Sequence, residues 1–425
     1  MSSLSEIRDP LHGYVRVNEL EAGIVDTPTF QRLKRIKQLS MVHLVYPGAE
    51  HSRFTHSLGV MHLAGKTAKV LRRQDLVTED EAQEVRLAAL LHDVGHGPFS
   101  HTFEDLLWSV RGMTHEDVTT WLIEEGELTE VIEDGGYEPS RIAAMALGRY
   151  RGDKSFVGEI VAGPYCSDIL DYLIRDAYFC GVEYGRIDTF RIIDSLSVCD
   201  GRLAVSIGSL YALEAFVIAR YEMFKAVYFH RTARAAGLMI SEAMQLADEE
   251  LGFTSFKNPK DYLELTDENV VDRILGSKSR RKNMRRAKEL VRAILARKLI
   301  KMTFERVFQT KDPFFTTFLK EEATRESLLD RIAEKAEVPR DKLFFDYPSL
   351  LSVPHYSMKG EYPAFVRENG EKRLISVPTL SHLLDSLAGY TNIIRIYSTE
   401  DVREKVEGAV GEILGGVDYT YKISY

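Results

Sequence analysis

The sequence predicts a mainly α-helical protein with short β-hairpins and a small α+β lobe at its C-terminal end. Apolar residues recur at helical spacing through most of the N-terminal part, as in 85–91 and 210–248. Further along, short alternating stretches replace this pattern, and Asn369-Gly370 is typical of a type I′ hairpin turn. We therefore expect a helical domain over residues 1–310 and an α+β lobe over residues 311–425.

Local signals predict the elements in order. Residues 7–18 surround a Pro/Gly turn and alternate weakly, which predicts a β-hairpin. Residues 19–39 are helical, with a restart at Thr27, an N-cap that a proline follows. Thr114 and Asp117 have the spacing of a capping box at a helix start. Beyond these we expect a helix over 165–179, a strand over 201–208, one long helix over 210–248, a hairpin over 364–377, a strand over 392–397 and a helix over 399–414.

The composition limits the classes of protein to consider. The chain has 425 residues, enough for a large core, and its 55 basic and 64 acidic residues leave a net charge of -9. This balance is not that of a general nucleic-acid binder. The 3 cysteines form no disulfide framework. Since no signal segment or membrane-length apolar run is present, we expect a cytoplasmic protein with no membrane partner.

The most informative stretch is 91–101, which follows an apolar helix. We expect His92 and Asp93 at the inner end of that helix, with His96 on the same face at the i+4 position. The glycines and proline that follow would break the helix and turn His101 back toward the same centre. The alternative is a helix end with a few exposed histidines. However, a buried His-Asp pair without partners would be costly, so we favour a functional site.

Two further residues complete a candidate metal site. His56 lies in the first turn of a predicted helix, and Asp168 lies in a polar stripe of another. With His92 and Asp93 they would surround one divalent cation, whose mixed N/O ligands suit Zn, Mn, Fe or Ni, and Mg less well. Such a cation can activate water and polarise a phosphoryl group, which predicts metal-assisted phosphoester hydrolysis.

Other charged residues have ordinary interpretations at this stage. Asp171 and Arg175 have the i,i+4 spacing of a simple helical ion pair, and we assign them no functional role. The basic block over residues 278–301 is most simply a solvated helix with its entry loop. The alternative is an anion or nucleotide site.

At this point the sequence resembles the HD-domain phosphohydrolases, and among them the deoxynucleoside triphosphate triphosphohydrolases. The resemblance covers about residues 5–310. It rests on Asp9-Pro10-Leu11-His12-Gly13, Asp26-Thr27-Pro28, Gln31-Arg32-Leu33, Ile36-Lys37-Gln38-Leu39, Arg53 through Val60, His92 through His101, and Asp168-Ile169-Leu170-Asp171-Tyr172. It implies an HD-domain helical core with a helical extension.

The resemblance also implies a role for each matching residue. His56, His92, Asp93 and Asp168 would hold the metal, whose identity stays open among Mn, Mg, Fe, Ni and Zn. Catalysis at the α-phosphate would involve His101, Glu104 and His115. Phosphate contacts would come from Arg53, His96, His115 and Arg220. Sugar and base contacts would come from Gln38, Leu39, Tyr172, Asp176 and Tyr228. An activating nucleotide would contact Asp26, Gln31 and Lys34.

The same resemblance implies a nucleotide substrate and a homo-oligomer, either a dimer or a tetramer. Two positions depart from the pattern: Ile169 replaces a basic residue that grips the triphosphate, and Phe229 replaces a polar one. Two alternatives to dNTP hydrolysis therefore stay open. One is an HD hydrolase of nucleoside monophosphates, cyclic nucleotides or another phosphoester. The other is a nucleotide or nucleic-acid binding regulator.

Overall fold

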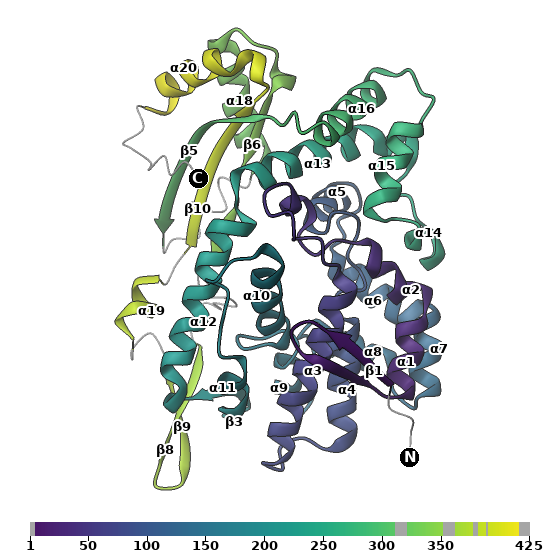
Figure 1. Cartoon of the computed structure of the whole chain (residues 1–425), viewed down its shortest axis with the longest axis vertical. Helices are drawn as coiled ribbons and strands as arrows, with labels where there is room; N and C mark the ends of the chain where they lie inside the picture. The colour runs from purple at the N-terminus through teal and green to yellow at the C-terminus, as the bar shows by residue number, and fades with distance from the viewer. Residues whose placement is uncertain (1–4, 311–320, 352–361, 377–380, 388–389, 416–425) are drawn as a thin grey trace.

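The computed structural model describes residues 5–310, 321–351, 362–376, 381–387 and 390–415, and it is mainly α-helical (Figure 1). The first helices are α1 (Glu19–Asp26), α2 (Pro28–Gln31), α3 (Arg53–Arg72), α4 (Glu79–Leu91), α5 (His101–Arg111), α6 (His115–Glu125), α7 (Glu127–Asp134), α8 (Pro139–Ala146), α9 (Phe156–Glu159) and α10 (Ser167–Cys180). They are followed by α11 (Thr189–Asp194), α12 (Leu210–Met223), α13 (Arg231–Leu251), α14 (Pro259–Leu263), α15 (Asp267–Gly276), α16 (Lys282–Leu295), α18 (Glu322–Ala336), α19 (His382–Leu387) and α20 (Arg403–Leu414). Among the helices described, none is both long and apolar enough to cross a membrane.

The strands form three small sheets. They are β1 (Ser5–Asp9), β2 (Gly13–Val17), β3 (Leu196–Cys199), β4 (Arg202–Ser206), β5 (Lys301–Thr310), β6 (Leu343–Asp346), β7 (Ser349–Leu351), β8 (Pro363–Glu368), β9 (Glu371–Ser376) and β10 (Tyr390–Ser398). The pair β1–β2 is an antiparallel hairpin, and β3-β4-β8-β9 form a second sheet in which β4 and β8 are parallel. In the third sheet β10 pairs with β5, β6 and β7. At one end of the molecule α18 and α20 pack on this sheet, and β8–β9 extend at the other end (Figure 1).

These sheets join the two parts of the chain that the sequence distinguishes. Strand β5, before the expected boundary at residue 310, already pairs with β10 of the lobe. Hairpin β8–β9 pairs with β4, which precedes α12. The boundary itself stays a prediction. The hairpin turn has positive φ at both Asn369 (53°) and Gly370 (89°), as a type I′ turn requires.

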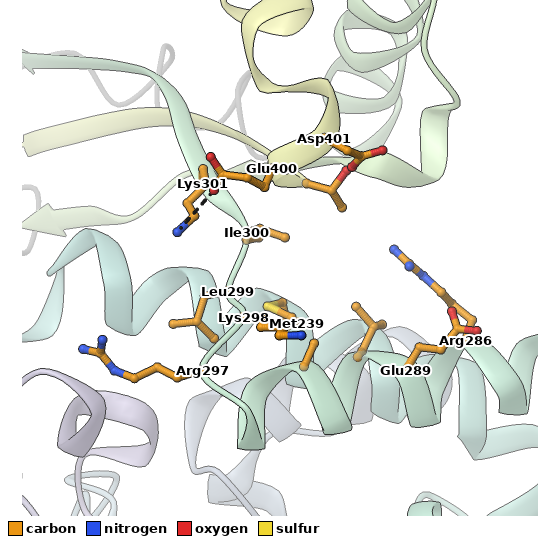
Figure 2. A pocket seen from close by; sticks show the side chains of 13 residues that line it. Met239, Arg286, Glu289, Arg297, Lys298, Leu299, Ile300, Lys301, Glu400 and Asp401 are labelled. Atoms are coloured by element: carbon orange, nitrogen blue, oxygen red, sulfur yellow. Dashed lines mark ion pairs between the residues drawn. The ribbon is translucent and has the colours of Figure 1, made fainter.

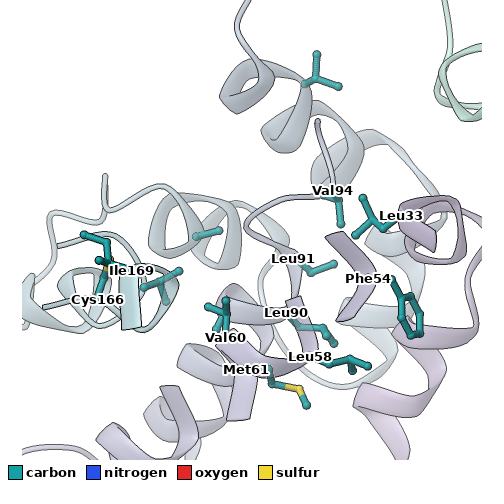
Figure 3. Packing of buried hydrophobic residues seen from close by; sticks show 14 of the residues in the cluster. Leu33, Phe54, Leu58, Val60, Met61, Leu90, Leu91, Val94, Cys166 and Ile169 are labelled. Atoms are coloured by element: carbon teal, nitrogen blue, oxygen red, sulfur yellow. The ribbon is translucent and has the colours of Figure 1, made fainter. Parts of the chain in front are cut away.

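The main hydrophobic core lies where α3 packs against α4 and α10. Leu58 and Met61 of α3 lie close to Leu90 and Leu91 at the end of α4 (Figure 3). Burial of the last turn of α4 places the residues that follow it inside the protein. The core therefore positions the start of the motif that begins at His92.

Most predicted elements are confirmed, and the local capping signals explain why. Thr27 accepts a hydrogen bond from the Phe30 N–H, and Thr114 and Asp117 form a complete capping box at α6. The prediction of one helix over 210–248 is wrong. After α12 the chain makes a π-helical turn, η4 (Phe224–Tyr228), and α13 begins only after His230, whose side chain caps it. Because both helices bury apolar residues, the apolar pattern continues across this break.

A buried ionic network ties the β1–β2 hairpin to α3 and α10. Arg175 donates to Asp9 at 2.9 Å and to both oxygens of Asp171 at 2.7 and 3.0 Å. His12 contacts the same Asp171 carboxylate at 2.6 Å, and Asp171 and Arg175 are fully buried. The predicted i,i+4 ion pair is therefore confirmed, but it is buried and has further partners from distant segments, which the spacing did not indicate.

Gly59 of α3 leaves room for this network. A Cβ atom at Gly59 would lie 2.0 Å from Asp171 Oδ1 and 2.4 Å from Arg175 Nη2. We expect Gly59→Ala to lower the free energy of unfolding by about 3 kcal/mol or more, because a buried ion pair must be displaced. Urea unfolding followed by circular dichroism measures this loss.

The matched control is Gly408→Ala in α20, where a Cβ would meet no atom within 4 Å. A helical glycine in open space should become more stable by about 0.5–1 kcal/mol on this change. Equal effects of the two substitutions would contradict the packing argument.

Candidate metal and catalytic site

Two histidines turn the same ring nitrogen toward one point. His56 is in the first turn of α3, and His92 directly follows α4. His56 Nδ1 donates to Asp171 Oδ2 at 2.9 Å, and His92 Nδ1 donates to the Ala89 carbonyl at 2.8 Å. Because both partners can only accept, each ring in its neutral form would present an Nε2 lone pair to the site.

Two carboxylates lie around these Nε2 atoms. His56 Nε2 is 3.0 Å from Asp168 Oδ1 and 3.8 Å from Asp93 Oδ2. His92 Nε2 is 3.3 Å from Asp93 Oδ1 and 3.8 Å from Asp168 Oδ1. The Asp168 side chain is 34% exposed, whereas the other three side chains are buried. The four ligands predicted from the sequence therefore meet at one point that is open on the Asp168 side.

The chemistry of this group fits a divalent metal. Within the part of the chain that the structure describes, His92 Nε2 is buried without a hydrogen-bond partner. Burial alone would lower the pKa of His56, but hydrogen bonds to Asp168 and Asp171 raise it to about 10. These carboxylates thus create a strong preference for positive charge, which a cation bound by two imidazoles and two carboxylates would satisfy.

A second group of imidazoles lies beside the first. The candidate ligand nitrogens of His96, His101 and His115 lie within 4.8 Å of one another, and the rings of His96 and His115 stack at 3.9 Å. Glu104 accepts from His101 Nδ1 at 3.1 Å and from His115 Nδ1 at 2.6 Å. Burial would raise the pKa of Glu104, but these two hydrogen bonds hold it well below its usual value. The His101 side chain is 74% exposed.

The loop between the two groups is tightly shaped. Helix α4 ends at Leu91, so the expectation that His96 shares its face is wrong; a turn brings His96 Nε2 to 3.4 Å from Asp93 Oδ1 instead. A Cβ at Gly95 would lie 2.2 Å from the His115 carbonyl oxygen, so this close approach requires glycine.

Arg53 joins the loop to the metal ligands. It is buried, its Nη1 donates to Asp93 Oδ2, and its Nε donates to Ser100 Oγ at 2.8 Å. This arginine therefore links Asp93 to the loop that contains Ser100.

An aromatic wall follows the metal site along α10 and the π-helical turn. The rings of Tyr172 and Tyr228 meet edge to face at 6.1 Å. Asp176 accepts from the Tyr228 hydroxyl at 2.7 Å and contacts His51 Nε2 at 2.8 Å. Sequence reasoning missed His51, whose partner lies 125 residues away. The buried Arg220 guanidinium lies 4.9 Å from the Phe224 ring.

The segment before α3 supplies the other predicted contacts of sugar and base. Gln38 N–H donates to the His51 carbonyl at 3.0 Å. Gln38 Oε1 is buried and has no partner among the residues described. Leu39, which is partly buried, packs against the main core.

The three residues predicted to bind an activating nucleotide lie at or near the surface. Asp26 and Lys34 are exposed. Lys34 donates to Gln31 Oε1 at 2.6 Å, and Gln31 Nε2 donates to the Val25 carbonyl at 2.7 Å. They therefore form one polar edge of the α1–α2 segment.

Both departures from the family pattern are buried apolar residues. Ile169 is 4% exposed and lies near Cys166 in the main core (Figure 3). Phe229 packs with Ile393 in a separate small cluster.

The basic block contributes to a cavity that the sequence did not indicate. The cavity has a volume of about 580 Å³ and lies between α13, α16 and the residues just before α20 (Figure 2). Its charged lining residues are Arg286, Glu289, Arg297, Lys298, Lys301, Glu400 and Asp401. Lys301 pairs with Glu400 at 3.3 Å, and Arg297 donates to the Leu44 carbonyl at 3.0 Å. Its lining includes none of the predicted metal or catalytic residues.

Comparisons with known proteins agree with this geometry. The HD domain family matches residues 53–134, and the HD associated region matches residues 187–422. The deoxynucleoside triphosphate triphosphohydrolase SAMHD1 homolog of Dictyostelium discoideum is 34% identical over 72% of this chain and 61% of its own length. Human SAMHD1 is 30% identical over 72% of this chain and 56% of its own length. The match thus spans about three fifths of these relatives.

Two solved structures are similar over nearly the whole chain. A hypothetical protein from Aquifex aeolicus is 34% identical with a TM-score of 0.77, covering 96% of this chain and 100% of that one. A phosphohydrolase from Bacteroides thetaiotaomicron is 26% identical with a TM-score of 0.73, covering 93% and 100%.

The geometry predicts a graded effect of substitutions on metal binding. Asp93→Asn should weaken binding more than about 100-fold, because it removes a direct ligand charge. Asp171→Asn should weaken it about 10- to 100-fold, because Asp171 is not itself a ligand and influences the metal through the orientation of His56. Elemental analysis after dialysis against Mn²⁺, Ni²⁺ or Zn²⁺ measures both.

The control is Asp134→Asn, which changes an exposed carboxylate at the end of α7. It should bind metal as the unmodified protein does. Full metal occupancy in Asp93→Asn would refute the ligand assignment.

Proposed function

Because this chain belongs to the HD-domain phosphohydrolases, we propose that it hydrolyses deoxynucleoside triphosphates to deoxynucleoside and inorganic triphosphate. One observation supports this most strongly: the His56/His92/Asp93/Asp168 group lies directly beside the His96/His101/His115 group. Metal ligands next to imidazoles that can bind phosphate or transfer a proton are what hydrolysis of a phosphoester needs. The curated relatives carry the triphosphohydrolase activity in their names.

We assign the metal to His56, His92, Asp93 and Asp168. A bound divalent ion there would polarise a phosphoryl oxygen and lower the pKa of a water molecule. The partly exposed Asp168 side leaves room for substrate.

His101 is proposed as the catalytic acid or base. Its Nδ1 faces the Glu104 carboxylate, so Nε2 is the atom available to move a proton. A proton given by Nε2 to the leaving 5′-oxygen would release the nucleoside. Glu104 would orient His101 and His115 together, since its two oxygens contact one imidazole each.

Phosphate binding is proposed for Arg53, His96, His115 and Arg220. Burial and the nearby Arg53 and His115 charges lower the pKa of His96 well below its usual value, so this imidazole stays neutral. A neutral ring can donate one hydrogen bond to a phosphate oxygen without the cost of a buried charge.

The sugar and base would contact Gln38, Leu39, Tyr172, Asp176 and Tyr228. The buried Gln38 Oε1 supports this, because a ligand donor would satisfy it. Asp26, Gln31 and Lys34 would bind an activating nucleotide in a symmetric dimer or tetramer, and their position at the surface is compatible with this role.

A second candidate is hydrolysis of nucleoside monophosphates, cyclic nucleotides or another phosphoester. Ile169 favours it, because this buried isoleucine brings no charge to neutralise a triphosphate. Incubation with each dNTP, dNMP and cyclic nucleotide in Mn²⁺ or Mg²⁺ separates the two, with products resolved by anion-exchange chromatography. We expect inorganic triphosphate and deoxynucleoside in equal amounts. Monophosphate or diphosphate products would overturn the proposal.

His101→Ala should keep its metal and lose about 100-fold or more in kcat, the usual scale for an acid–base group. Ser109→Ala, on the exposed side of the same helix, is the control and should keep its activity. Initial rates and metal content measured on the same preparations test this. Near-normal turnover of His101→Ala would contradict the catalytic role.

A further inference from the structure

The start of α15 is hydrogen-bonded to the loop that precedes His101. Asp267, the first residue of α15, is 6% exposed. Its Oδ1 accepts the Phe99 N–H at 2.7 Å, and its Oδ2 accepts the Lys37 N–H at 3.0 Å. Phe99 is two residues before His101, and Lys37 immediately precedes Gln38. One carboxylate therefore holds both a catalytic loop and a substrate-facing segment.

The loop held by Asp267 is in a conformation that needs support. Phe99 and Ser100 both have positive φ, 57° and 56°, which side chains other than glycine rarely adopt. Ser100 Oγ also donates to the Lys37 carbonyl at 3.2 Å. Strained residues persist only where their surroundings over-determine them, and here Asp267 supplies the principal bond to the Phe99 peptide.

The residues just before α15 hold the other end of the loop. Tyr262 donates its hydroxyl proton to the Gly95 carbonyl at 2.7 Å. Arg32 donates to the Leu265 carbonyl at 3.0 Å and to the Val94 carbonyl at 3.4 Å. These contacts anchor the start of the loop independently of Asp267, so a change at Asp267 should act on its His101 end.

We propose that Asp267, as a carboxylate, is a positioning residue that fixes His101 and Gln38 relative to each other. This inference rests on the proposed function for the role of His101. It adds an element from outside the HD domain match at residues 53–134, because Asp267 belongs to the HD associated region.

The chemistry of the two bonds requires an ionised group. Two N–H donors need two acceptor oxygens, whereas a protonated acid or an amide presents a donor to one of them. Burial raises the pKa of Asp267 to about 6. The hydrogen bonds from the Lys37 and Phe99 N–H groups and the charges of Lys37 and Arg32 lower this pKa, but by less than burial raises it. Arg32, whose charge acts on Asp267, also lies 4.5 Å from the Tyr262 ring.

The direction of this shift determines how Asp267 affects stability as the pH changes. A raised folded-state pKa means that the contribution of Asp267 to stability is present below its ordinary pKa and is lost as pH rises through about 6. The group is therefore ionised at pH 7.5 at a cost to stability, and it is protonated at pH 5.

The test compares Asp267→Asn with Asp272→Asn, an exposed carboxylate on the same helix. Hydrogen exchange by mass spectrometry, corrected for intrinsic rates, follows the peptides that contain Phe99 and Lys37. Both should exchange at least 10-fold faster in Asp267→Asn at pH 7.5, and neither should change in Asp272→Asn. In the unmodified protein both should become faster between pH 7.5 and pH 5, and Asp267→Asn should lack this pH step.

Kinetics with dGTP and Mn²⁺ form the second measurement. Asp267→Asn should lower kcat at least 10-fold and raise KM, with metal content unchanged, since His101 and Gln38 both shift. A loss of folded protein alone would lower kcat without changing KM, which would overturn the positioning role.

The two measurements separate this inference from the proposed function. If no nucleotide is hydrolysed, the proposed function fails, but the exchange data still decide whether Asp267 holds both peptides. If Asp267→Asn does not fold, the pH step in the unmodified protein carries the test. Unchanged exchange at either peptide overturns the proposal.

Discussion

The site depends first on the buried carboxylate of Asp171. It accepts hydrogen bonds from Arg175, lies 2.6 Å from His12 Nε2, and accepts the hydrogen bond of His56 Nδ1, which orients that ring. Removing one partner of a buried charge costs about 3–5 kcal/mol, so none of these groups can move alone. The β1–β2 hairpin, α3 and α10 are therefore held in one arrangement by the same charge that orients His56, a proposed metal ligand.

Around this centre the two groups of site residues are held in different ways. The proposed metal ligands lie in the first turns of α3 and α10 or directly after α4, next to the closely packed main core. His101 instead begins α5 after two residues of positive φ. Arg53 connects these two groups, because it donates hydrogen bonds to both Asp93 and Ser100.

Residues beyond the HD domain match at 53–134 contact the candidate site directly. Tyr228 lies beside Tyr172, and Asp267 bonds to the loop before His101, although both belong to the matched HD associated region. The Tyr228 side of the aromatic wall and the support of the loop thus come from the second half of the chain.

The sequence alone determined what depends on neighbours along the chain. The capping box at Thr114, the hairpin turn at Asn369 and the residue types of the metal ligands were all readable, because each signal spans a few residues. The break between α12 and α13 was not, since the apolar pattern continues across it. The partnership of His56 with Asp171 spans 115 residues and that of Phe99 with Asp267 spans 168. Only the tertiary structure decided these, because burial creates the need for a partner and packing selects which distant residue supplies it.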